Sequence, residues 1–177
     1  MAVSKVLLGI DDTAVVGALS QLDRDTLGGA KPMFKHILLP TDGSELSATA
    51  VRDGIKFAKE IGARVTGLHV TTPFHPTELT PSALTAHMHE HDAQAKESAQ
   101  RALGSITETA RAAGVPCATV HRVSNSPYEA IVALAGETGC DLIFMASHGR
   151  RGVAALLLGS ETNKVLTHSK IPVLVTR

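Results

Sequence analysis

The stretch DLIFMASHGRRGVAALLLGS, residues 141–160, decides how the rest of the chain is interpreted. It opens with the apolar run 142–145, typical of a buried parallel strand, and continues into the small-residue turn 146–149. Nine residues then separate Gly149 from Gly159, and Ser160 follows as the expected N-cap of a helix that runs to His168. Glycines at a turn and at a helix start suit a bound anion such as phosphate, because backbone N–H groups can approach it closely. The alternative is that these glycines only shape loops.

Composition and charge predict a globular cytoplasmic protein and argue against nucleic-acid and membrane partners. A chain of 177 residues with 44% hydrophobic and 19% charged residues suits one globular domain. Seventeen basic residues balance seventeen acidic ones, so we expect neither a nucleic-acid nor a membrane partner. No apolar run approaches the roughly 20 residues that span a bilayer, and no signal-peptide pattern opens the chain. Two distant cysteines, Cys117 and Cys140, favour reduced thiols and hence a cytoplasmic protein.

From residue 34 onward, strand and helix patterns alternate. The pattern predicts strands over 36–40, 64–70, 117–123, 141–146 and 172–176, and helices over about 45–61, 82–113 and 127–137. Ser44 and Gly62 mark the start and end of the first helix, and Pro127 marks the start of the third. Residues 1–33 do not match this pattern. We interpret them as an N-terminal extension, loosely attached or non-native, ahead of a single domain over 34–177.

Strands joined by helices of crossover length predict an α/β fold, a single doubly wound parallel sheet with helices on both faces. In such sheets ligands bind beyond the carboxyl ends of the strands, where the strand order reverses. This rule selects residues 41–43 after the first strand and 146–149 after the fourth. The topology and the glycine turn therefore point to one crevice.

Several segments together resemble the universal stress protein family over essentially all of 34–177. They are HILLPTDGSE at 36–45, LHV at 68–70, SHGRRG at 147–152, LLLGSETNKVLTHS at 156–169 and PVLV at 172–175. The ATP-binding branch of that family has a Gly-x2-Gly-x9-Gly-Ser/Thr loop. Gly149, Gly159 and Ser160 match its second half, whereas Ala146 replaces its first glycine. If the loop requires a left-handed backbone at position 146, alanine costs about 1–2 kcal/mol there. If it requires only a small side chain, alanine costs almost nothing.

The resemblance implies a five-stranded sheet of order 3-2-1-4-5 and a homodimer in which the last strand, Pro172 to Thr176, pairs with its copy. It also implies ATP, accompanied by Mg²⁺ or Mn²⁺, in the crevice. Asp42 would bind the ribose or adenine end. The remaining contacts would come from the adenine wall (Pro40, Thr41 and Val70), the ribose side (Met145 and Ala146) and the phosphate loop (His148, Gly149, Gly159 and Ser160).

The resulting functional hypothesis is a nucleotide-dependent switch or adaptor in stress response, acting on an unidentified protein partner. The alternatives are a dimeric interaction module without nucleotide binding, and a slow ATPase or autophosphorylating protein. No nucleophile–base pair and no GxxxxGK[ST] loop is visible, so no catalytic residue is predicted. His87, His89 and His91 lack the HExxH arrangement and are interpreted as a solvated cluster, so no metal-ligating residue is predicted either.

Overall fold

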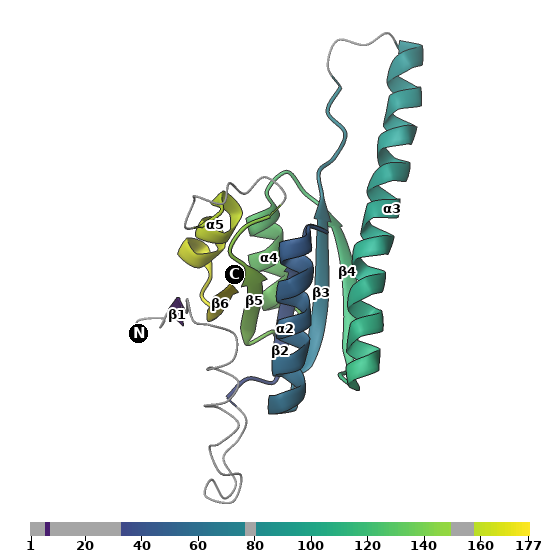
Figure 1. The fold of residues 1–177 in the computed structure, drawn as a ribbon. Helices are drawn as coiled ribbons and strands as arrows, with labels where there is room; N and C mark the ends of the chain where they lie inside the picture. The colour runs from purple at the N-terminus through teal and green to yellow at the C-terminus, as the bar shows by residue number, and fades with distance from the viewer. Residues whose placement is uncertain (1–5, 8–32, 77–80, 150–157) are drawn as a thin grey trace, which may run out of the picture.

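A computed structural model describes residues 6–7, 33–76, 81–149 and 158–177 (Figure 1). Their elements follow in the order β1 (Val6–Leu7), β2 (His36–Thr41), α2 (Glu45–Ile61), β3 (Arg64–Thr71), α3 (Pro81–Ala113), β4 (Cys117–Val123), α4 (Pro127–Glu137), β5 (Leu142–Ala146), α5 (Ser160–His168) and β6 (Val173–Thr176). The predicted helices over 45–61 and 127–137 are confirmed at both ends, and α3 begins one residue earlier than expected.

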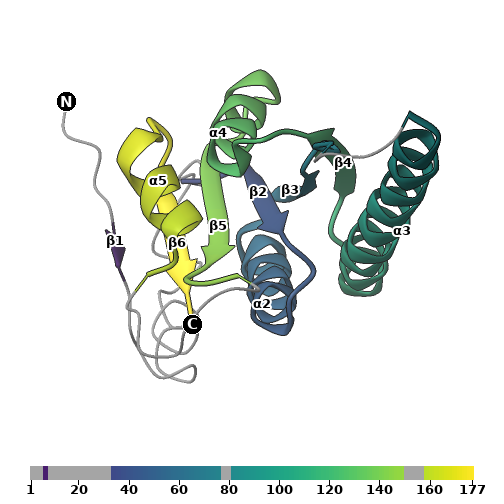
Figure 2. The same ribbon diagram turned by 90° about the horizontal axis from the view of Figure 1, so that it is seen from above.

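The strands form one parallel sheet in the order β1-β6-β5-β2-β3-β4. Without β1, this order is 3-2-1-4-5 in chain sequence, which confirms the expected fold. The order reverses between β2 and β5, where Ile37 pairs with Leu142 and Leu38 with Ile143. Helices α2 and α3 cover one face of the sheet, and α4 and α5 cover the other (Figure 2). The reversal creates the setting in which a doubly wound sheet binds ligands.

The core consists of two apolar layers, one on each face of the sheet. Because side chains alternate along a strand, Ile37 and Leu39 of β2 lie in the layer beneath α2 and α3, whereas Leu38 lies in the layer beneath α4 and α5. All three side chains have no exposed surface. Burying a side chain of this size contributes about 1.5–3 kcal/mol, so these layers fix the sheet that carries the site.

The ends of α2 follow from its caps. The Ser44 hydroxyl accepts a hydrogen bond from the Ser47 N–H at 3.2 Å, which satisfies one unpaired donor of the first turn. Gly62 ends the helix with a left-handed backbone at φ 69°, and its N–H donates to carbonyls of the last turn. Both caps match the sequence-based prediction. The Ser44 cap fixes the start of α2 shortly after β2 ends at Thr41.

Most of the predicted N-terminal extension lies outside the described residues. The short strand β1 lies beside β6 at the edge of the sheet, whereas the rest of the predicted extension, apart from residue 33, lies outside the described residues. The loose attachment of residues 1–33 therefore stays a prediction. Among the described helices, none combines the length and apolarity needed to cross a membrane.

Candidate functional site

The residues predicted to bind a ligand follow the ends of the neighbouring strands β2 and β5. Asp42 follows the last residue of β2, and its Oδ1 accepts a hydrogen bond from the Ser44 N–H at 3.0 Å. The turn after β5 reaches the same place, because a Cβ built on Gly149 would lie 2.4 Å from Asp42 Oδ2. The structure thus brings together the acid of the first predicted segment and the glycine of the second.

Gly149 is required for space and not for backbone conformation. The described glycines with positive φ are Gly43, Gly62, Gly114 and Gly139, so Gly149 does not use the left-handed region. A methyl group at this position would instead overlap the carboxylate of Asp42. The missing side chain is what allows the turn and the acid to lie in contact.

Gly159, at the start of α5, lies against the turn that follows β5. Its N–H donates to the Ser147 carbonyl at 2.8 Å, and an added Cβ would lie 3.3 Å from that oxygen and 3.4 Å from the His148 Cα. Gly159 is the N-cap of α5, with an extended backbone at φ −69° and ψ 156°. The prediction that Ser160 is the cap is therefore wrong: Ser160 is the first helical residue, and it is exposed. A residue without a side chain fits the N-cap here because the backbone of the turn lies so close.

The first turn of α5 presents backbone donors. The Asn163 N–H is the first to bond back along the helix, to the Gly159 carbonyl at 2.9 Å. The amides of residues 160–162 therefore have no acceptor within the helix. Glu161 would repel an anion at this position, but its carboxylate accepts hydrogen bonds from the Tyr128 N–H at 2.9 Å and from Lys164 Nζ at 2.8 Å. The first bond holds the Glu161 carboxylate against α4, and the second pairs it with the positive charge of Lys164.

The imidazole of His148 lies in the turn before Gly149, and its two nitrogens have different surroundings. Its Nδ1 lies 2.9 Å from the Ser147 hydroxyl, whereas its Nε2 is buried and has no hydrogen-bond partner among the described residues. A buried nitrogen without a partner costs about 1–3 kcal/mol relative to one that is hydrogen-bonded. An incoming phosphate oxygen is one acceptor that would remove this cost, which fits the predicted role of His148.

Ala146 carries no backbone strain. It is the last residue of β5, pairs with Thr176 and is buried, and no described residue other than glycine has a positive φ. Ala146 therefore avoids the left-handed conformation that would cost it about 1–2 kcal/mol. The carbonyl of Ala146 accepts a hydrogen bond from the buried Thr162 hydroxyl at 3.0 Å. Thr162 is a positioning residue that the motif comparison missed, although it lies two residues after Ser160.

The predicted adenine wall is assembled from adjacent strands. Pro40 and Thr41 are buried at the end of β2, and the half-buried Val70 of β3 packs against the core layer beneath α4. The polar atoms of Thr41 are engaged within the protein, since its hydroxyl bonds Ser47 Oγ at 2.9 Å and its carbonyl accepts from His69 Nδ1 at 2.9 Å. Thr41 is therefore suited to an apolar wall and not to a polar contact. Met145 lies buried one residue before the turn.

Two other groups named in the sequence analysis do not belong to the described part of this site. Arg150 and Arg151 of the motif lie outside the described residues, as does the rest of 150–157. His87 and His89 of α3 are exposed, and the described residues contain no group of three or more His, Cys, Asp and Glu side chains that could hold a metal ion.

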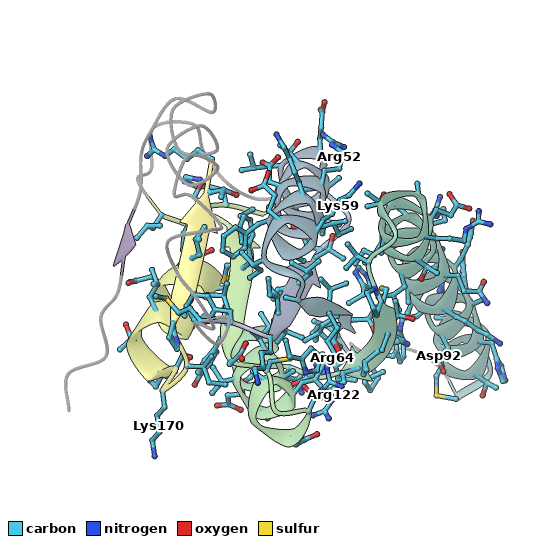
Figure 3. All side chains as sticks on the ribbon, turned by 90° about the horizontal axis from the view of Figure 1, so that it is seen from below. Arg52, Lys59, Arg64, Asp92, Arg122 and Lys170 are labelled. Atoms are coloured by element: carbon cyan, nitrogen blue, oxygen red, sulfur yellow. The ribbon has the colours of Figure 1, made fainter. Side chains whose placement is uncertain are left out.

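An open surface pocket of about 420 Å³ lies at the opposite end of the strands and was not predicted. Its lining includes Arg64, labelled in Figure 3, together with His36 and Thr66. The Arg64 guanidinium donates to His36 Nδ1 at 3.1 Å, and His36 Nε2 lies 2.8 Å from Thr66 Oγ1. Burial, followed by the charge of Arg64, lowers the pKa of His36. The ring is thus held neutral as part of the structure, far from the glycine turn.

Comparisons with known proteins agree with this geometry. The family model described as "Universal stress protein family" matches residues 33–177. Universal stress protein MJ0531 of Methanocaldococcus jannaschii is 32% identical over 149 residues, which cover 82% of this chain and 83% of that protein. Universal stress protein YxiE of Bacillus subtilis is 32% identical over 152 residues, covering 82% of this chain and all of YxiE.

Solved structures share the fold. The structure of MJ0577 superposes with a TM-score of 0.68 at 31% identity and covers 81% of this chain and 96% of that one. A universal stress protein in complex with cAMP (TM-score 0.59, 24% identity, 82% and 98% coverage) and one from Archaeoglobus fulgidus in complex with dAMP (0.55, 20%, 82% and 99%) are similar in fold alone. Together with the sequence matches, the fold and the converging turns show that this chain belongs to the universal stress protein family.

Proposed function

We propose that the chain binds ATP in the crevice between the ends of β2 and β5 and acts as a nucleotide-dependent switch or adaptor. The observation that carries the proposal is the contact between Asp42 and the backbone of Gly149, beside the N-terminus of α5. In this proposal Asp42 binds the sugar or base of the nucleotide, and the neighbouring backbone N–H groups bind its phosphates. The cAMP and dAMP complexes of structural neighbours support a nucleotide as the ligand class.

The free energy of nucleotide binding would have to come from several protein groups at once. Micromolar affinity corresponds to about 8 kcal/mol, whereas one anion at a helix N-terminus gains only about 0.3–1 kcal/mol, or about 2 in a favourable geometry. The amides of residues 160–162, His148 Nε2 and the apolar wall formed by Pro40 and Val70 would have to contribute together. The absence of strain at Ala146 removes the main argument for the alternative, an interaction module that has lost nucleotide binding.

A divalent ion would accompany the phosphates. Mg²⁺ prefers oxygen ligands and is usually held by one or two protein oxygens together with phosphates and water. The exposed Ser160 hydroxyl at the helix start is an oxygen of the required type. When bound, Mg²⁺ or Mn²⁺ would neutralise phosphate charge, and no step of hydrolysis is assigned to it. Slow ATP hydrolysis or autophosphorylation remains a separate hypothesis, tested by phosphate release or by label transfer to the protein.

Thermal unfolding with and without Mg-ATP tests the proposal. A ligand present at 100 times its Kd stabilises the folded state by about 2.7 kcal/mol, which raises the Tm of a domain of this size by about 5–10 °C. Gly159→Val should abolish the shift, because its side chain would displace the backbone of residues 147–149. AMP and GTP serve as ligand controls. The absence of any shift at millimolar nucleotide would refute nucleotide binding.

A further inference from the structure

The edge of the sheet formed by β6 is not open in this chain. On one side, β6 pairs with β5 along its whole length, from Ile143 opposite Val173 to Ala146 opposite Thr176. On the other side, β1 pairs with it in parallel, with Val6 opposite Leu174 and Leu7 opposite Val175 (Figure 2). Strand β1 therefore covers the two central residues of a four-residue strand.

Without β1, β6 would be an edge strand with little protection against pairing. Edge strands usually avoid pairing with other chains through charged side chains or proline within the strand. The segment 171–176, IPVLVT, has no charged residue, and its Pro172 precedes the strand. Val173 and Val175 are buried in the core, so the strand is firmly held in an extended form. Such an edge is a ready template for another strand.

The partner that best fits this edge is a second copy of the same chain. Two copies present the same row of backbone groups, so pairing through β6 is self-complementary and closes with twofold symmetry. No charge within 173–176 opposes the approach of an identical strand. A strand from a second copy would require the edge-facing backbone groups of β6 where β1 pairs with Leu174 and Val175. The two arrangements are therefore mutually exclusive at these residues.

We infer that β1 is an intramolecular cover of the β6 edge and that it competes with pairing of β6 between two copies of this chain. The competition is reversible, because β1 has only two residues. Loss of the one or two net hydrogen bonds that such a strand supplies corresponds to roughly a tenfold change in an equilibrium constant. The N-terminal segment thus sets the concentration at which the protein dimerises. The inference rests on the expected dimerisation through β6 and is independent of nucleotide binding.

The test uses the full-length chain without nucleotide. Val6→Pro/Leu7→Pro removes both backbone donors of β1, whereas Val6→Ile/Leu7→Val retains them and serves as the matched control. Hydrogen exchange of segment 173–176 at low protein concentration should be faster in the proline variant. Sedimentation velocity over a concentration series should show a dimer Kd roughly tenfold lower than that of the control.

Either of two results would overturn the inference. Unchanged exchange of segment 173–176 would mean that β1 does not cover the edge. Faster exchange without tighter self-association would mean that the uncovered edge does not pair with a second copy. Because ATP is absent from both measurements, neither result bears on the proposed nucleotide site, and a negative ATP melt would leave this inference intact.

Discussion

The carboxylate of Asp42 lies against the backbone of Gly149, close enough that a Cβ on the glycine would come within 2.4 Å of Oδ2. Two segments more than 100 residues apart in sequence thus meet at the point where the strand order reverses. The contact joins an acid suited to a sugar or base and a turn suited to phosphate. A single methyl group on Gly149 would disturb this contact.

Gly149→Ala is expected to weaken ATP binding by at least about tenfold, because the new methyl group must displace the Asp42 side chain or the turn. Isothermal titration calorimetry with Mg-ATP measures the change. Gly104→Ala is the matched control, since a Cβ at that position in α3 meets nothing within 4 Å. The control should bind ATP normally and gain about 0.5–1 kcal/mol of stability from helix propensity. Equal affinities for both variants would contradict the role of the contact.

Thr162→Val tests whether α5 positions the end of β5. The buried hydroxyl donates to the Ala146 carbonyl, so valine leaves that oxygen without this donor and should cost about 1–3 kcal/mol of unfolding free energy. Thr167→Val, on the exposed side of the same helix, removes only a bond to the Asn163 carbonyl and should cost far less. Urea unfolding gives both values. The ATP affinity of the folded Thr162→Val protein should also fall, and an unchanged affinity would show that Thr162 supports the fold alone.

Local signals in the sequence were sufficient to predict most of the fold. Ser44, Gly62 and Pro127 mark helix ends through interactions within a few residues, so the bounds of α2 and α4 follow from neighbouring residues. The pairing of β1 with β6 depends instead on which edge of the finished sheet is open, which a two-residue strand cannot reveal.

The members of the candidate site were named from the sequence motif and stay predictions, whereas the packing around them comes from the structure alone. The motif selects Gly149 and Gly159, yet only the structure shows that the first is required by Asp42 and that the second is the helix cap. The hydrogen bond from the Tyr128 N–H to the Glu161 carboxylate joins α4 to α5 across 33 positions of sequence. No local pattern predicts it. Contacts of this kind depend on three-dimensional packing and not on spacing.

Gly67→Ala is expected to destabilise the domain by about 1–3 kcal/mol, the usual cost of overpacking a core. A Cβ on Gly67 of β3 would lie 2.8 Å from Ile106 Cδ1 and 3.0 Å from its Cγ2, and Ile106 is fully buried. The double variant Gly67→Ala/Ile106→Val should recover part of the loss, because valine lacks the Cδ1 methyl group. Chemical denaturation measures each variant. A loss that Ile106→Val does not reduce would show that the strain lies elsewhere.

The lowered pKa of His36 predicts a pH dependence of stability. Its main cause is burial, and Arg64, which donates to Nδ1, adds to it, while Asp141 and the carbonyls of Thr138 and Gly139 oppose it. Below about pH 6.5 the unfolded chain binds a proton at this histidine that the folded protein does not, so stability is complete above that pH and is lost as the pH falls towards the lowered value.

His36→Gln should therefore flatten the decline of the unfolding free energy between pH 7.5 and 5, by up to about 1.4 kcal/mol per pH unit, the contribution of one proton. The variant should also be less stable at pH 7.5, because the bonds to Arg64 and Thr66 are altered. His121→Gln is the control, since that residue is exposed, its ring bonds the Thr71 hydroxyl, and it lies beside the ring of His69. Urea titrations across this range compare the slopes, and parallel slopes for wild type and His36→Gln would show that another group carries the acid sensitivity.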